Sequence, residues 1–229
     1  LWTNGKVNYF FDPAFSENGR KFVLMAMRFY EANTCIRFHE VDPTLNEHKI
    51  RIYRGKACES RLGRYHEMTQ DLSLNAGCER FDSSCHELGH ALGFIHTHTR
   101  SDRDNWIWVD MKNVDGNYTS QYEKWDAGED KLLWGSATTT VVSCTTGQRG
   151  LWAKDTSKDV MVAYNSKYQM AIGASQTPTF TDIAIMNKLY SCNTCPGNKL
   201  NCARGGYPHP NDCTRCHCPS GFGESIAGR

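Results

Sequence analysis

The residues best placed to do chemistry together lie in one short segment, residues 86–96, which read HELGHALGFIH. On a helix, His86 and His90 are four positions apart and project from one face, so two imidazoles can reach one ion. Gly93 can adopt a positive φ and let the chain leave the helix, which would bring His96 round as a third ligand. Three neutral imidazoles leave the fourth position of a zinc ion for water, the arrangement of catalytic rather than structural zinc sites.

Glu87 follows the first of these histidines directly. Its carboxylate can take a proton from the attacking water and pass it to the leaving amine of a peptide bond. The alternative is a chance His-Glu-x-x-His on a surface helix. The third histidine and the intervening glycine both fall at the metzincin spacing, and this favours the metal site. The segment therefore predicts zinc-assisted hydrolysis of protein or peptide substrates, with one zinc ion per chain.

Hydrophobic periodicity predicts the elements that must position this segment. The alternation of Val7, Tyr9 and Phe11 is typical of a half-buried strand, and Ser16 is placed to cap the helix that follows. We expect strands at 7–11, 36–38, 50–53 and 72–74, and helices over about 19–33, from 83–84 onward and over about 181–190. Strands dominate the first third and helices the remainder, so the predicted fold class is α+β.

Composition excludes several functional classes. The chain has 229 residues, 26 basic and 25 acidic side chains and a formal net charge of +1, so no basic field points to nucleic acid. No apolar run approaches the roughly 18 residues that a membrane span needs. The hydrophobic fraction of 39% is sufficient for a packed core.

The cysteines divide the chain into two parts. Of the 11 cysteines, 5 fall in residues 1–191 and 6 in residues 192–229, where Gly and Pro lie between them. This change predicts a large domain, then a boundary near Tyr190, then a small disulfide-rich module. A zinc ribbon is the competing interpretation of the second cluster. The high cysteine content instead favours disulfides and an extracellular, secreted protein.

Residues 86–105, HELGHALGFIHTHTRSDRDN, resemble the signature of the astacin family of zinc endopeptidases. The segments NTCIRF at 33–38 and KLY at 188–190 agree, and the resemblance covers nearly all of residues 1–191. It implies a two-lobed metzincin protease domain with zinc at the bottom of a cleft, secreted and made with a pro-segment that blocks the zinc. Family pairing would join Cys35 to Cys192 and Cys58 to Cys78.

Residues 192–229 resemble part of an EGF-like module, through LNCARGGY at 200–207 and CHCPSGFG at 216–223. An astacin domain followed by such a module is similar to nematode astacins. The EGF order would join Cys195 to Cys213 and Cys202 to Cys216, and it would leave Cys218 without a partner. We expect this module to make extracellular protein contacts.

Two departures from the family pattern concern the N-terminus and the floor of the site. The family commonly has Glu at the position of Thr97, where it helps hold the mature N-terminus, and by this resemblance the extreme N-terminus is missing. The family also carries a Met-turn, Tyr-Asp-Tyr-Gly-Ser-Val-Met-His-Tyr-Gly, but residues 138–147 read TTTVVSCTTG. One coding sequence for these residues, read one base earlier, encodes the family string. We therefore hypothesise that residues 131–154 are translated out of frame; the alternative is genuine divergence.

Genuine divergence would remove the Met-turn and its Tyr, and this leads to a second functional hypothesis. The chain would then be a zinc-binding but catalytically impaired homologue that acts as a secreted binding protein. Two further expectations concern single residues. Asn117 begins an Asn-Tyr-Thr glycosylation sequon. Cys85 is expected to be an inert, partly buried thiol unless it pairs with Cys144.

Overall fold

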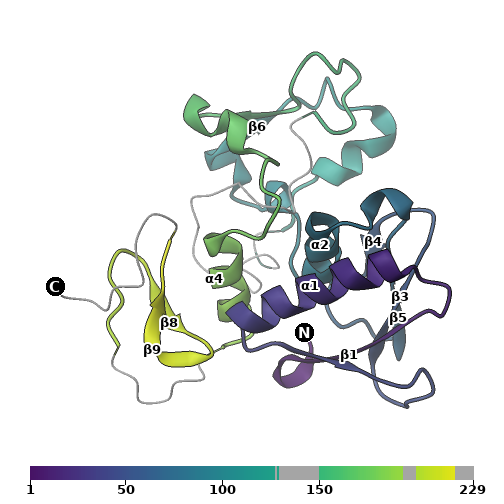
Figure 1. The fold of residues 1–229 in the computed structure, drawn as a ribbon. Coiled ribbons are helices and arrows are strands. Elements are labelled where there is room, and N and C mark those ends of the chain that lie inside the picture. The colour runs from purple at the N-terminus through teal and green to yellow at the C-terminus, as the bar shows by residue number, and fades with distance from the viewer. Residues whose placement is uncertain (127, 129–149, 193–199, 220–229) are drawn as a thin grey trace. The chain divides into compact units, whose positions relative to one another are not determined.

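The computed structural model describes residues 1–126, 128, 150–192 and 200–219 (Figure 1). Contacts between residues divide the chain into two compact units. Unit 1 comprises Leu1–Phe94 and Phe180–Arg229, and unit 2 comprises Ile95–Thr179. Within the described residues, every helix is too short or too polar to cross a bilayer.

A five-stranded sheet organises unit 1, in the order β2-β1-β3-β5-β4 (Figure 1). Neighbouring strands run parallel except the edge strand β4, which is antiparallel to β5. Ile50, Ile52 and Leu72 lie on one face of the sheet and are fully buried, whereas the Arg51 and Asp71 side chains on the other face are partly exposed. The strands are β1 (Lys6–Phe11), β2 (Arg37–Glu40), β3 (Lys49–Tyr53), β4 (Glu59–Ser60) and β5 (Thr69–Ser73).

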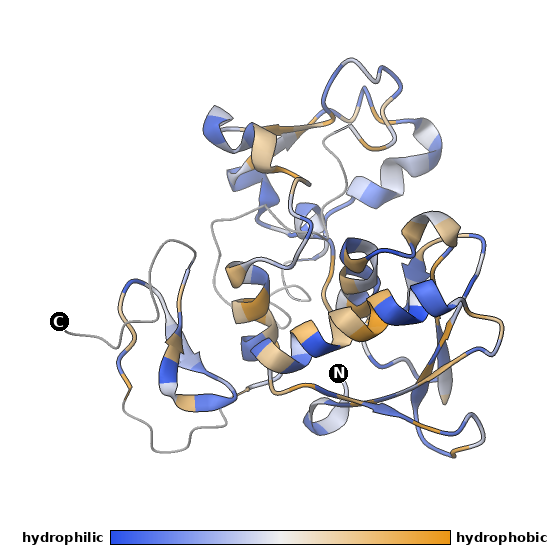
Figure 2. Cartoon of the chain, viewed as in Figure 1, coloured by the Kyte–Doolittle hydropathy of each residue, from blue (hydrophilic) through white to orange (hydrophobic). Residues whose placement is uncertain are grey.

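Helix α1 (Glu17–Asn33) confirms the helix predicted over 19–33 and begins two residues earlier. Ser16 is its N-cap, and the Ser16 side chain accepts a hydrogen bond from the Gly19 backbone N–H at 2.9 Å, as predicted. Figure 2 shows hydrophobic and hydrophilic residues alternating along the helix, which is the pattern of an amphipathic element. Its buried face includes Val23, Ala26, Met27 and Tyr30, and the helix packs against α2.

Helix α2 (Phe81–Ala91) carries the predicted metal-binding segment but begins earlier than the predicted start at 83–84. The Ser84 hydroxyl donates to the Arg80 carbonyl at 2.8 Å, so Ser84 lies inside the helix instead of capping it. The last helix, α4 (Phe180–Leu189), begins one residue before its expected start near 181. Shorter 3₁₀ helices in unit 1 span Thr3–Gly5 and Ala76–Cys78.

In unit 2, the helices expected after the first third occur as 3₁₀ helices. The described residues of unit 2 contain no α-helix; they form one strand pair and four 3₁₀ helices. The side chains of Asp115 and Asn165 accept hydrogen bonds from backbone N–H groups two residues further on, which favours tight turns over α-helix. Antiparallel strands β6 (Ile107–Val109) and β7 (Met161–Ala163) are accompanied by 3₁₀ helices at Thr97–Thr99, Arg103–Asn105, Gly116–Tyr122 and Ser166–Ala171.

The core of unit 2 includes residues from the segment hypothesised to be out of frame. Trp152 and Ala153 pack against a buried cluster formed by Ile107, Val109, Val114, Tyr122, Val160, Met161 and Ile172. The Tyr122 hydroxyl donates to the Leu151 carbonyl at 2.6 Å. Residues 138–147, where the Met-turn is expected, lie outside the described residues.

The C-terminal part of unit 1 is a hairpin of β8 (Tyr207–His209) and β9 (Asp212–His217). Disulfides join Cys35 to Cys192, Cys58 to Cys78 and Cys202 to Cys216. These three pairs coincide with those that the family and EGF resemblances imply. Cys213 is also disulfide-bonded, but the Cys195 half of its expected pair lies outside the described residues, as does Cys144. The thiol of Cys218 is free and Cys85 is fully buried.

Candidate metal centre

Helix α2 presents His86 and His90 from one face, as their four-residue spacing predicts. Their Nε2 atoms are 3.0 Å apart, and their rings are perpendicular with centroids 4.6 Å apart. His96 follows the helix, and one ligand atom from each of the three histidines lies within 4.8 Å of the other two. The structure thus brings together the three predicted ligands.

His90 is oriented by the backbone of the turn that follows the helix. Its Nδ1 lies 2.7 Å from the Phe94 carbonyl oxygen, so Nδ1–H donates to this oxygen and the lone pair is left on Nε2. Burial lowers the pKa of His90 to about 3, and the nearby His86 adds to this effect. The imidazole is therefore neutral at physiological pH and can bind a metal without first losing a proton.

Gly93 makes the turn between the second and third histidines. Its φ is +99°, which confirms the positive φ predicted there. The Gly93 N–H donates to the His90 carbonyl at 2.8 Å, and the Phe94 N–H donates to the Gly89 carbonyl at 2.9 Å. The turn thereby ends α2 and places the Phe94 carbonyl where the His90 ring can reach it.

Glu87 follows His86 in α2 and supplies a buried carboxyl. The residue is 5% exposed, and burial raises its pKa to about 8, with a smaller contribution from the negative charge of Glu59. Among the described residues, the buried Oε2 atom has no hydrogen-bond partner. A bound water would satisfy this oxygen, and a carboxyl in such a position can accept and return a proton.

The donor set fits a zinc ion. Imidazole nitrogens suit zinc and other late transition metals, whereas magnesium and calcium require oxygen ligands. Three imidazoles with an adjacent carboxyl and an open fourth position are typical of catalytic zinc sites. The neutral, oriented His90 and the unsatisfied oxygen of Glu87 both agree with this assignment.

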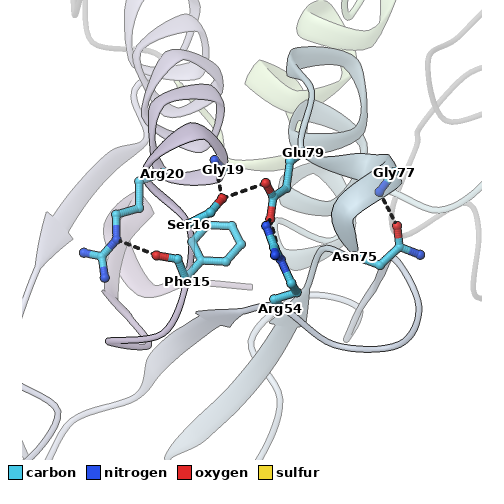
Figure 3. A network of polar contacts seen from close by, with 8 residues as sticks. All are labelled: Phe15, Ser16, Gly19, Arg20, Arg54, Asn75, Gly77 and Glu79. Atoms are coloured by element: carbon cyan, nitrogen blue, oxygen red, sulfur yellow. Dashed lines mark hydrogen bonds and ion pairs between the residues drawn. The ribbon is translucent and has the colours of Figure 1, made fainter.

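Glu79, two residues before α2, holds the start of this helix (Figure 3). One oxygen of its buried carboxylate accepts from the Ser16 hydroxyl at 2.6 Å, and the other accepts from Arg54 Nε at 2.8 Å. Glu79 therefore ties the N-cap of α1 and the residue after β3 to the beginning of the metal-binding helix. The sequence gives no signal for this role, because the partners lie 63 and 25 residues away.

The segment after His96 is fixed by buried arginines of unit 2. The Arg103 guanidinium donates to the carbonyls of His98 and Tyr122. Arg100 makes two parallel hydrogen bonds to Asp102, each 2.7 Å long. The His98 ring stacks on His96, with centroids 5.2 Å apart. These contacts hold the backbone that carries the third histidine.

Comparison with known proteins identifies relatives of this chain. The family model Astacin, a peptidase family, matches residues 1–191. Zinc metalloproteinase nas-31 of Caenorhabditis elegans is 36% identical over 219 residues, which cover 95% of this chain and 35% of that protein. Zinc metalloproteinase nas-27 of the same organism is 37% identical over 218 residues, which cover 94% of this chain and 50% of that protein.

A solved structure shares the fold. High choriolytic enzyme 1, a hatching enzyme zinc-protease from the medaka fish Oryzias latipes, has a TM-score of 0.74 and 29% sequence identity, over 83% of this chain and 92% of that one. The present chain spans no more than half the length of the two nematode relatives described above. Because the family model covers most of the chain, including the three histidines and Glu87, the chain belongs to the astacin family of peptidases.

Proposed function

We propose that this chain is a zinc-dependent endopeptidase that hydrolyses peptide bonds within proteins, with His86, His90 and His96 as the ligands of one zinc ion. The observation that carries the proposal is the convergence of three imidazoles, together with the buried, unsatisfied carboxyl of Glu87 on the helix that carries two of them. Membership of a peptidase family and the zinc metalloproteinases among its relatives support it.

Glu87 is the residue to which we assign proton transfer. A bound zinc ion would supply Lewis-acid chemistry, lowering the pKa of water and polarising the peptide carbonyl. Glu87 accepts the proton of the attacking water and then donates it to the nitrogen of the leaving amine. The raised pKa of its buried carboxyl supports this role, because a less acidic carboxyl is the stronger proton acceptor; a zinc ion nearby would favour the carboxylate that the first transfer needs. His90 stays fixed through its hydrogen bond to Phe94.

The test is peptidase activity that depends on Glu87 while the metal site stays filled. We expect the purified chain to cleave protein substrates, to lose activity to a chelator and to regain it with zinc. Glu87→Gln keeps the side-chain volume and should lower kcat by about 10²–10⁴-fold. Its zinc content should stay at one ion per chain. Equal activity in the wild type and Glu87→Gln would contradict the proposal.

The second candidate function is a zinc-binding but catalytically impaired homologue that acts as a secreted binding protein. The sequence of residues 138–147 favours it, because the Met-turn string and its Tyr are missing from the chain as written. Both candidates bind zinc, so zinc content does not separate them. A wild-type chain that holds zinc and shows no Glu87-dependent cleavage supports the second candidate.

The out-of-frame segment remains our explanation for the missing Met-turn. The described end of the segment, residues 150–154, packs in unit 2 through Trp152 and Ala153. This packing favours a downstream indel close to Gly150. Sequencing the transcript across codons 131–154 tests the hypothesis: two compensating indels would support it, and an intact frame would overturn it in favour of divergence.

We also infer a secreted protein with two domains, residues 1–191 for catalysis and 192–229 as a partial EGF-like module for extracellular contacts. Three disulfides support an oxidising compartment. Asn117 is exposed at the start of a 3₁₀ helix, where a glycan could be attached. Expression through a secretory pathway should give a glycosidase-sensitive mass, and Asn117→Gln should abolish that sensitivity. An unmodified secreted wild type would exclude glycosylation at Asn117.

A further inference from the structure

The C-terminal end of α2 is held by three segments that are distant in sequence. The last carbonyls of a helix have no partner within the helix, so other groups must satisfy them. The His90 carbonyl accepts from the Gly63 N–H at 2.8 Å. The Ala91 carbonyl accepts from Trp2 Nε1 at 2.8 Å, and the Leu92 carbonyl accepts from the Tyr190 hydroxyl at 2.9 Å.

The two side-chain donors, Trp2 and Tyr190, are buried or hydrogen-bonded within unit 1. Trp2 is only 3% exposed, and its hydrogen bond to Ala91 is buried. Burial raises the pKa of Tyr190, and a hydrogen bond from the Trp2 backbone N–H to the Tyr190 oxygen opposes this rise only in part. The Tyr190 hydroxyl therefore stays protonated and able to donate. If a buried carbonyl loses such a donor, the free energy of unfolding falls by an amount comparable to the contribution of one hydrogen bond.

The same two segments also pack on Gly93, which makes the turn. A Cβ atom at Gly93 would lie 2.9 Å from Leu1 Cδ2 and 3.7 Å from Leu189 Cδ2. Leu1 precedes Trp2 and Leu189 precedes Tyr190. Each segment thus places one leucine on the side of the turn where a Gly93 side chain would project, and it donates one hydrogen bond to the helix end.

This turn sets the geometry of the metal ligands. It carries the Phe94 carbonyl to within 2.7 Å of His90 Nδ1, and His96 follows Phe94 by two residues. Movement of the carbonyls of Ala91 or Leu92 would shift the Phe94 carbonyl, which orients the His90 ring. It would also shift the backbone that leads to His96.

We propose that Trp2 and Tyr190 are positioning residues of the metal centre: by binding the carbonyls of Ala91 and Leu92, they fix the turn that orients His90 and delivers His96. The inference rests on the proposed zinc site. It assigns to the metal centre two residues that lie 89 and 98 positions away from their partners in the sequence.

The test compares zinc affinity among variants that lose one hydrogen-bond donor. Tyr190→Phe removes only the hydroxyl. Replacing Trp2 by its benzothiophene analogue keeps the ring and removes only the N–H, and Trp2→Phe is a genetic alternative. Ser73→Ala is the matched control, because it also removes only a hydroxyl that donates to a backbone carbonyl, that of Ala57 at 2.6 Å, and Ser73 lies at the end of strand β5. The full chain is stripped of metal, and zinc is titrated in competition with a fluorescent chelator. Cobalt is then added to record the visible absorption of the site.

We expect each change at Trp2 or Tyr190 to weaken zinc binding about tenfold and to shift the cobalt absorption bands, the order of effect seen when groups supporting metal ligands are removed. Ser73→Ala should leave both measurements unchanged even where it lowers stability. If the Tyr190 and Trp2 changes lower stability but leave zinc affinity and the cobalt spectrum at wild-type values, the positioning role is refuted. If the wild type itself binds no zinc, the proposed function fails instead.

Discussion

Glu79 shows how one buried side chain can hold several elements together. Its carboxylate bonds both Ser16 and Arg54, and it is 7% exposed. Glu79→Ala should lower the free energy of unfolding by about 2–4 kcal/mol, because it leaves these two donors without their acceptor. Urea unfolding of the metal-free chain measures the change.

The matched control for Glu79→Ala is Glu17→Ala, which removes a carboxylate from the first turn of α1. Glu17 is 96% exposed and pairs with Arg20 at 3.9 Å, so its loss should cost no more than about 0.5 kcal/mol. Equal losses from Glu79→Ala and Glu17→Ala would show that the buried network contributes nothing beyond an ordinary surface pair.

Three tyrosines predict a loss of stability at alkaline pH. Burial raises the pKa values of Tyr9, Tyr122 and Tyr207 to about 12, and for Tyr9 nearby carboxylates add to the effect. An unfolded tyrosine releases its proton near pH 10, so between pH 10 and 12 the folded state binds more protons than the unfolded state. The free energy of unfolding should therefore fall as pH rises through this window.

Urea midpoints at several alkaline pH values, with tyrosinate absorbance, would measure this dependence. Tyr122→Phe should make the pH slope shallower. Tyr164→Phe, at a residue that is 63% exposed, is the matched control. A slope in Tyr122→Phe that equals the wild-type slope would exclude the Tyr122 contribution.

Among the elements, the turn after α2 depends on glycine for two separable reasons. Gly93 has a positive φ, and an added Cβ would meet the Leu1 side chain at 2.9 Å. Gly63 also has a positive φ, but the nearest atom to its added Cβ is at 3.8 Å. Gly63→Ala therefore measures backbone strain alone, about 1 kcal/mol, and Gly93→Ala should cost about 2–3 kcal/mol.

Zinc affinity gives the second readout for these two variants. Gly93→Ala should weaken zinc binding, because the turn carries the Phe94 carbonyl that orients His90. Gly63→Ala should change it less. Similar stability and affinity in the two variants would show that the Leu1 side chain yields and that packing on the turn has no influence on the metal site.

The elements differ in how well sequence predicts them, for identifiable physical reasons. Helix α1 and strand β1 follow from periodicity and a local cap, and both occur where predicted. The start of α2 was misplaced because Ser84 can either cap a helix or bond the carbonyl four residues earlier, and it does the latter. Strands β4, β6 and β7 contain two or three residues each, too few to show alternation.

Some residues of the candidate site can be predicted from their local spacing, and others depend on contacts that are distant in the sequence. The positions of the histidines and of the turn at Gly93 follow from spacing along one helix, so the sequence indicated them. The groups that hold the two ends of that helix, Glu79, Trp2 and Tyr190, act through partners that are far away in the chain. No periodicity carries such information, and only the folded structure identifies these residues.

Across the whole molecule, the C-terminal hairpin is attached to the body of unit 1 through the end of α1. The Asn211 side chain, between β8 and β9, donates to the carbonyls of Glu31 and Ala32 at 2.7 and 3.0 Å. It also accepts from Arg37 at 2.6 Å. Asn211 therefore satisfies carbonyls at the end of a helix whose own sequence offers no basic residue in the last turn.

Loss of this attachment should loosen the hairpin without disturbing the metal site. Asn211→Ala should lower stability by about 1 kcal/mol and speed hydrogen exchange in residues 207–217 and at the end of α1. Zinc affinity should be unchanged, because no Asn211 hydrogen bond reaches α2 among the described residues.

Asn165→Ala, which removes an exposed cap in unit 2, is the matched control and should leave exchange in the hairpin at the wild-type rate. If Asn211→Ala and Asn165→Ala leave hairpin exchange equally slow, Asn211 does not hold the C-terminal segment; if Asn211→Ala weakens zinc binding, the hairpin and the metal centre are coupled through the end of α1.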